Sequence, residues 1–158
     1  MIKLYREVGG VLRYHEAWPT EAGVTEHWGV VGERGETRAH PVDPGRTPSE
    51  VIEAILQPAI DDGYAPIDDE RMVTVVIEYP IEGMGASDDL DRRHDLEERM
   101  DETLGWTGLG HCDGGSIGSG SMEVFCIVID ADIARRTITD DLRDTAHAGH
   151  SRIALLET

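Results

Sequence analysis

The sequence has few of the features that mark secreted, disulfide-rich or membrane proteins. Its two cysteines, Cys112 and Cys126, are too few for a disulfide framework, so we expect a reduced, cytoplasmic protein. No apolar run opens the chain or approaches the length of a membrane span, which predicts neither a signal peptide nor a transmembrane helix. A chain of 158 residues can form one ordinary domain or two small ones.

Positive charge is also scarce. Fourteen Lys and Arg face 32 Asp and Glu, which gives a formal net charge of −18. The first 70 residues carry 6 basic and 14 acidic side chains and the rest carry 8 and 18, so the excess does not belong to one tail. Such a surface repels phosphate backbones and anionic membranes and attracts basic partners. We therefore expect a basic protein partner and no membrane, and nucleic acid is disfavoured without being excluded.

Residues 1–70 predict a small sheet with one helix. Residues 2–15 have the pattern of a hairpin that turns at Gly9 and Gly10, and residues 24–31 predict a further strand. Thr47, Pro48 and Glu50 predict a helix start, because they supply an N-cap, a first-turn proline and a capping box. Pro58 should kink or end this helix.

The run from His27 to Thr37, HWGVVGERGET, precedes a helix that ends at Gly63 and Tyr64. Over roughly residues 2–67 this arrangement resembles the WGR domain, which is known from DNA-dependent poly(ADP-ribose) polymerases and from bacterial proteins. The matching residues are Trp28, Gly29, Gly32, Gly35, Gly63 and Tyr64. The resemblance implies a small antiparallel sheet with one helix, in which the Trp and Arg of the motif contact DNA ends and neighbouring domains.

The arginine of that motif is replaced here by Val30. Trp28 remains a candidate interaction residue, and Arg34 and Arg38 are the nearby cations that could substitute for the missing arginine. Both lie among Glu33 and Glu36, which oppose contact with phosphate. We therefore favour a structural or interface role for Trp28 over contact with nucleic acid.

Residues 71–158 predict a second domain with a ferredoxin-like βαββαβ sandwich, so the fold class is α+β. The expected order is a strand at 72–79, a helix at 88–104, a glycine-rich strand, a strand at 122–130, a helix that Asp130 caps and Gly149 ends, and a strand at 152–156. The "GSGSMEVF" segment that opens the third of these strands is similar to one in small bacterial proteins, a likeness that implies a fold and no chemistry.

The strand at 122–130 is apolar on both faces. Phe125, Ile127 and Ile129 alternate with a second apolar set, and two helices can cover only one face of a four-stranded sheet. We expect the second face to contact the N-terminal domain or a second copy of the chain in a homodimer. The residues assigned to that interaction are Val124, Cys126 and Val128.

The segment from Cys112 to Phe125, CDGGSIGSGSMEVF, contains a G-x-S-x-G match centred on Ser116. A serine-hydrolase elbow needs a strand before the serine and a helix after it, whereas here a helix precedes and a strand follows. A phosphate-binding loop would need a lysine that is missing. We therefore assign the glycines to a strand and hairpin. We expect a bulky residue at Gly118 to damage folding or partner binding, and Ser116→Ala to leave function nearly intact.

A metal site is the remaining chemical alternative. His111, Cys112 and Asp113 are adjacent, Cys126 can lie across the hairpin, and His94 or His147 could complete a ligand set. Adjacent strand residues point to opposite faces, so at most two of the first three can share a site with Cys126. We expect buried cysteines, with no metal, no cofactor and no catalytic residues.

These observations predict a non-enzymatic, acidic protein-binding protein. The leading hypothesis is a neutralising partner of a basic or nucleic-acid-directed enzyme, as immunity proteins and antitoxins are. The alternative is a WGR-type nucleic-acid-binding module that uses Trp28.

Overall fold

The glycine pair at residues 9 and 10 sets the first hairpin of the chain. Strands β1 (Ile2–Val8) and β2 (Val11–Thr20) pair antiparallel with Val8 opposite Val11. Gly9 and Gly10 have φ values of 59° and 79°, and a two-residue type I′ turn requires positive φ at both positions. Strands β3 (Gly23–Val30) and β4 (Glu36–His40) complete an antiparallel sheet in the order β1-β2-β3-β4. The hairpin and third strand are confirmed, whereas β4 was not predicted.

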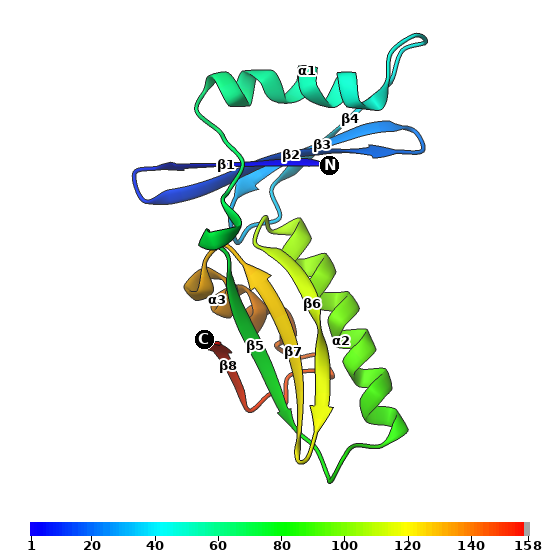
Figure 1. Ribbon diagram of the computed structural model, residues 1–158, viewed down its shortest axis with the longest axis vertical. Helices are drawn as coiled ribbons and strands as arrows, with labels where there is room; N and C mark the ends of the chain where they lie inside the picture. The colour runs from blue at the N-terminus through cyan, green and yellow to red at the C-terminus, as the bar shows by residue number, and fades with distance from the viewer. Residues whose placement is uncertain (157–158) are drawn as a thin grey trace. The chain divides into compact units, whose positions relative to one another are not determined.

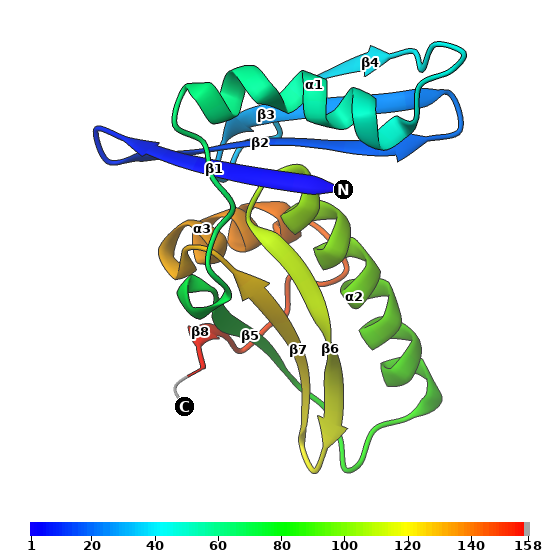
Figure 2. The same ribbon diagram turned by 45° about the horizontal axis from the view of Figure 1, so that its top comes forward.

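Helix α1 (Pro48–Asp61) starts at the predicted cap and packs on one face of this sheet (Figure 2). The Thr47 side chain accepts a hydrogen bond from the Glu50 N–H, and the Glu50 carboxylate accepts one from the Thr47 N–H. Pro58 was predicted to kink or end the helix, and it does not end it, because α1 continues through Pro58 to Asp61. The sheet and helix enclose a core of Leu4, Ala17, Val24, Val51, Ile52, Leu56 and Ala59.

The second sheet belongs to a separate unit of the chain (Figure 1). Its elements follow one another as β5 (Val73–Pro80), α2 (Ser87–Trp106), β6 (Gly110–Gly118), β7 (Ser121–Val128), α3 (Ala131–Leu142) and β8 (Arg152–Leu155). The strands are antiparallel in the order β6-β7-β5-β8, which is the ferredoxin-like arrangement. A short 3-10 helix, Asp69–Arg71, precedes β5.

The computed structural model describes residues 1–156. In this range the chain has three α-helices and two four-stranded antiparallel sheets, so the predicted α+β fold class is correct. The division between the two units falls between Asp68 and Asp69, two residues before the expected boundary. None of the helices in the described range is long and apolar enough to span a membrane.

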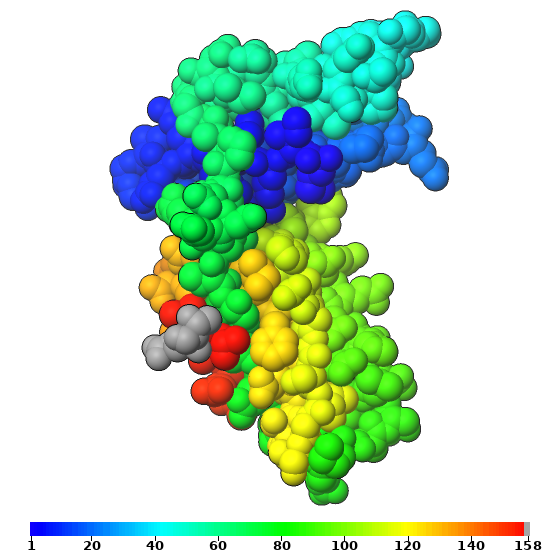
Figure 3. Space-filling view, in the orientation of Figure 1, coloured from blue at the N-terminus to red at the C-terminus, as the bar shows by residue number. Residues whose placement is uncertain are grey.

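Both helices of the second unit lie on the same face of its sheet (Figure 1). Val124, Cys126 and Val128 point to this face and are completely buried, so the assignment of these residues to an interaction surface is wrong. The alternation of β7 had allowed either face to meet the helices, and the structure selects this one. Phe125 and Ile127 alternate with this set on β7, so they point to the other face, and both are half-buried. Figure 3 shows this other face, on which β5, β6 and β7 are not covered by the helices.

Helix α3 is shorter than predicted. Asp130 caps it as expected, because its carboxylate accepts a hydrogen bond from the Ile133 N–H at 2.8 Å. The helix ends at Leu142 and not at Gly149. Asp144, just beyond the end, has a φ of 61°, a left-handed conformation that an α-helix cannot include. Residues 145–150 therefore form turns that lead into β8.

Candidate functional site

Trp28 is held on the first sheet between a histidine and an arginine. β3 places Trp28 on the same face as the helix-covered Val24, because the two residues are an even number of positions apart. The Arg38 guanidinium on β4 lies 5.5 Å from the Trp28 ring centroid, within cation–π range. The His15 ring on β2 is 5.8 Å from the same ring and tilted by 30°. His15, Trp28 and Arg38 thus form a row across three strands, which we call the Trp28 row.

Glu26 lies beside this row and joins two histidines. Its two carboxylate oxygens lie 2.7 Å from His15 Nε2 and 2.9 Å from His40 Nε2. Burial favours the neutral acid, but hydrogen bonds from His40 and His15 outweigh it and lower the pKa of Glu26. Because His15 also contacts Trp28, the carboxylate fixes the orientation of one ring of the Trp28 row.

Arg34 does not join the Trp28 row. It lies in the β3–β4 connection, and its main-chain carbonyl is hydrogen-bonded to His27 Nε2. Of the three interaction residues predicted in the first unit, the structure therefore brings together Trp28 and Arg38 and leaves out Arg34. The contacts of Glu26 with His15 and His40 were not predicted, because they depend on the register between the strands, which cannot be read from the sequence.

The opposite face of the first sheet carries a buried polar network. His27 is fully buried, with Nδ1 2.8 Å from Glu16 Oε1 and Nε2 3.1 Å from the Tyr14 hydroxyl. Lys3 Nζ lies 3.6 Å from the second Glu16 oxygen. His27 Nε2 is also hydrogen-bonded to the Arg34 carbonyl in the β3–β4 connection. This network orders the connection after β3.

Two glycines of the WGR-like pattern are explained by packing around the same connection. A Cβ on Gly35 would lie 2.1 Å from the Trp28 carbonyl oxygen and 2.5 Å from the Tyr14 hydroxyl. A Cβ on Gly29 would lie 2.8 Å from the Gly35 Cα. The two backbones approach so closely that neither position accepts a side chain without movement. Close packing accounts for these glycines without any ligand.

A stripe of carboxylates runs along helix α2. Asp88, Asp91, Asp95, Glu98 and Glu102 are spaced by three or four residues, so they share one face, and all five are exposed. The buried residues of α2, Leu96, Met100, Thr103 and Leu104, lie on the opposite face. We call these five residues the α2 acidic stripe. At a rise of 1.5 Å per residue it is roughly 20 Å long.

The cations of α2 do not neutralise this stripe. Arg92 pairs with Asp89 at 3.3 Å, Arg93 with Glu97 at 3.2 Å and Arg99 with Asp141 on α3 at 2.9 Å. All three carboxylate partners lie outside the α2 acidic stripe. Among residues 1–156, no hydrogen bond or ion pair engages a carboxylate of the stripe. Its negative charge is therefore directed at solvent.

The glycine-rich stretch forms the β6–β7 hairpin, as predicted. Ser116 lies within β6 opposite Glu123, so the serine sits in an extended strand and not at a strand-to-helix turn. The register of the β6–β7 pairing shifts between Cys112 and Gly115, where the intervening residues form a bulge. A Cβ at Gly118 would meet no atom within 4 Å, so crowding gives no reason for a larger residue there to damage folding, and the expected effect on partner binding stays a prediction. The crowded position is Gly115, where a Cβ would lie 2.5 Å from the Glu123 carbonyl oxygen.

The two cysteines face each other across this hairpin. Cys112 on β6 is the register partner of Cys126 on β7, and burial raises the pKa of both thiols. Raised pKa values keep the thiols protonated and poorly suited to bind metal or act as nucleophiles. Over the described range, no group of three or more His, Cys, Asp or Glu side chains is arranged to hold a metal ion.

No protein-family model matches the chain, and neither the curated proteins nor the solved structures include one that is significantly similar to it. The WGR likeness therefore rests on the sequence pattern alone.

Proposed function

We propose that this protein is a non-enzymatic, acidic binding protein that neutralises a basic or nucleic-acid-directed enzyme, in the manner of an immunity protein or antitoxin. The α2 acidic stripe is the observation that carries the proposal. It concentrates five exposed carboxylates on one rigid element, in a chain whose net charge is −18.

The stripe is suited to a basic protein surface for two reasons. Its carboxylates are not engaged by the helix's own arginines, so binding a cationic partner breaks no ion pair within the helix. The residues also stand on a helix anchored by buried Leu96, Met100 and Leu104, which keeps the charges in register. Complementary charge of this kind speeds association and selects partners of opposite sign.

The test compares variants with equal net charge. The stripe variant carries Asp91→Asn, Asp95→Asn and Glu98→Gln, and the control carries Glu21→Gln, Asp43→Asn and Glu53→Gln on exposed positions of the first unit. The immobilised proteins are exposed to lysate of the source cells at low and high salt. We expect basic proteins retained at low salt by the wild type and the control, and lost by the stripe variant. Equal retention by all three would refute a role for the stripe, and no retained basic protein would refute the proposal.

One observation favours a second candidate, a nucleic-acid-binding module of the WGR type. Arg38 is exposed, lies over the Trp28 ring and forms no ion pair with a carboxylate of the described chain. An aromatic ring beside an arginine can stack on a base while the guanidinium meets phosphate. The net charge opposes this function, which is why it ranks second.

A mobility-shift assay with short DNA duplexes distinguishes the two candidates. Binding that disappears in both Trp28→Ala and Arg38→Gln, and persists in the exposed control Arg46→Gln, would replace the first proposal with the second. If wild-type protein shifts none of the duplexes at low salt, the second candidate is eliminated.

A further inference from the structure

Strand β8 is an edge of the second sheet, and one side of its backbone is unpaired. The Leu156 N–H donates to the Thr74 carbonyl at 2.8 Å, and Ala154 and Arg152 are opposite Val76 and Glu78. In an antiparallel ladder alternate residues turn their N–H and C=O groups toward the neighbour, so residues 152, 154 and 156 face β5. Ile153 and Leu155 therefore turn theirs outward, where no backbone or side chain of the described residues bonds them.

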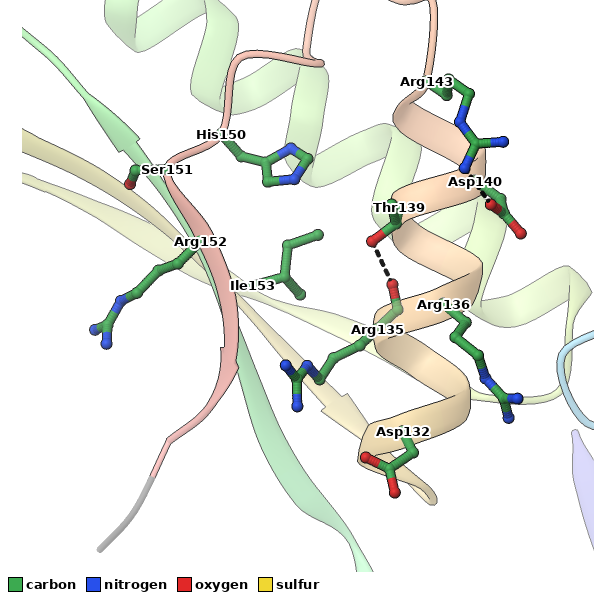
Figure 4. A pocket seen from close by; sticks show the side chains of 10 residues that line it. All are labelled: Asp132, Arg135, Arg136, Thr139, Asp140, Arg143, His150, Ser151, Arg152 and Ile153. Atoms are coloured by element: carbon green, nitrogen blue, oxygen red, sulfur yellow. Dashed lines mark hydrogen bonds and ion pairs between the residues drawn. The ribbon is translucent and has the colours of Figure 1, made fainter.

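A groove with a volume of about 950 Å³ lies between β8 and α3, beside this free edge (Figure 4). Its lining holds four arginines and two aspartates, an excess of positive charge in a chain of net charge −18. The arginines are Arg135, Arg136, Arg143 and Arg152.

Two of these arginines are neutralised and two are not. Arg143 pairs with Asp140 at 2.9 Å, and Arg152 pairs with Glu78 at 2.9 Å. Arg135 and Arg136 form no ion pair with another residue between 1 and 156. In Figure 4 the Arg135 guanidinium extends from α3 toward β8, whereas Arg136 points away from β8. Arg135 is thus the unpaired cation that faces the groove.

Two further side chains shape the floor of the groove. His150 and Ile153 project from the β8 segment toward α3 (Figure 4). The Nδ1 atom of His150 is shielded from solvent and has no hydrogen-bond partner among the described residues. Ile153 supplies an apolar surface between this nitrogen and Arg135. The groove therefore offers an unpaired cation and an apolar wall next to open backbone groups.

We propose that the free edge of β8 binds an extended acidic peptide segment of a partner protein as an added, fifth strand. The outward groups of Ile153 and Leu155 supply main-chain hydrogen bonds, the usual source of affinity when a peptide adds to a sheet edge. Alternate side chains of the added strand point into the groove, where a carboxylate meets the Arg135 guanidinium. The remaining side chains of the peptide point to the uncovered face of the sheet.

Charge selects an acidic peptide over a neutral or basic one. Most of the surface of this chain repels carboxylates, so the α3–β8 groove is where an acidic segment finds unpaired arginine. The site is separate from the α2 acidic stripe, and the proposal is independent of the function proposed above.

The probe is a short fluorescein-labelled peptide of alternating Glu and Thr, with binding to the full chain followed by fluorescence anisotropy at low salt. We expect saturable binding, and about tenfold weaker binding by the matched peptide of alternating Gln and Thr. Arg135→Gln should weaken binding of the Glu peptide by about tenfold, while Arg46→Gln in the first unit leaves it unchanged. No binding of the Glu peptide, or equal binding by wild type and Arg135→Gln, overturns the proposal.

Modified peptides test strand addition without altering the protein. Two versions of the Glu peptide carry N-methyl groups on alternate residues, one on the Glu residues and the other on the Thr residues. In an extended strand these two sets of N–H groups point to opposite edges. Only one edge of an added strand faces β8, so one version should lose binding and the other should retain it. Retention by both versions, or loss by both, would show that the peptide does not pair with the edge of β8.

Discussion

At the scale of single residues, the crowding around Gly115 gives a stability prediction. A Cβ at this position would lie 2.5 Å from the Glu123 carbonyl oxygen and 2.9 Å from Glu97 Oε1, whereas one at Gly118 meets open space. We expect Gly115→Ala to lower the free energy of unfolding by about 2 kcal/mol, as overpacking does, and Gly118→Ala to change it little. Urea denaturation of both variants measures the difference. Equal effects at the two glycines would show that the bulge relaxes freely.

Glu26 gives a pH-dependent prediction at the same scale. Hydrogen bonds from two histidines lower its pKa from 4.5 in the folded state, so the unfolded chain binds its proton more readily. The carboxylate therefore contributes stability above pH 4.5, and this contribution is lost as the pH falls through the lowered folded-state pKa. We expect Glu26→Gln to be less stable than wild type by about 2 kcal/mol near pH 5.5.

Urea denaturation at about pH 5.5 and about pH 3 checks this prediction, because the difference between the two proteins should shrink as Glu26 is protonated. Other carboxylates titrate in both proteins and cancel from the comparison. A difference that stays constant or grows toward pH 3 would contradict the role given to the two histidines.

At the scale of secondary-structure elements, the proline within α1 should limit the stability of that helix. Pro58 has no N–H to donate to the carbonyl four residues before it, yet the helix continues to Asp61. We expect Pro58→Ala to raise the free energy of unfolding by about 1–3 kcal/mol. Pro48→Ala is the matched control, because Pro48 lies in the first turn where no intrahelical bond is missing. Thermal denaturation of both variants tests this, and a Pro58→Ala protein no more stable than Pro48→Ala would contradict it.

The elements also show how far the sequence could predict this fold. Glycine pairs, caps and apolar alternation located the β1–β2 and β6–β7 hairpins, the starts of all three helices to within one residue and the order of the second sheet. β4 was missed because its residues, ETRAH, are mostly exposed and lack an apolar face, so only pairing with β3 defines it as a strand. The end of α3 was missed because the apolar spacing continues to Ala146 although the backbone turns left-handed at Asp144.

The candidate sites were harder to predict than the elements, for a reason visible in β7. Its two faces are equally apolar, so composition could not tell which set of residues meets the helices, and the wrong set was chosen. The Trp28 row depends on the register between neighbouring strands. The α3–β8 groove depends on which of its arginines form ion pairs with carboxylates. The α2 acidic stripe is different, since its spacing is local and can be found in the sequence once the helix is recognised.

At the scale of the whole molecule, the charge excess should make stability depend on salt. With 32 acidic and 14 basic side chains, repulsion between carboxylates opposes the compact state, and added salt screens it. We therefore expect the Tm to rise as NaCl is added from low to moderate concentration. Screening also weakens favourable ion pairs, but 14 basic side chains can pair one to one with fewer than half of the 32 carboxylates.

The α2 acidic stripe should account for a measurable part of this effect. Successive carboxylates of the stripe are three or four residues apart, and each such like-charge pair destabilises a helix by about 0.2–0.5 kcal/mol. The variant with Asp91→Asn, Asp95→Asn and Glu98→Gln removes every one of these pairs, so at low salt it should be more stable than wild type by about 1–2 kcal/mol. The control with Glu21→Gln, Asp43→Asn and Glu53→Gln has the same net charge and should gain less. Thermal denaturation at low and moderate NaCl measures both effects. A Tm that falls as NaCl is added, or a control that gains as much as the stripe variant, would show that the repulsion is not concentrated on α2.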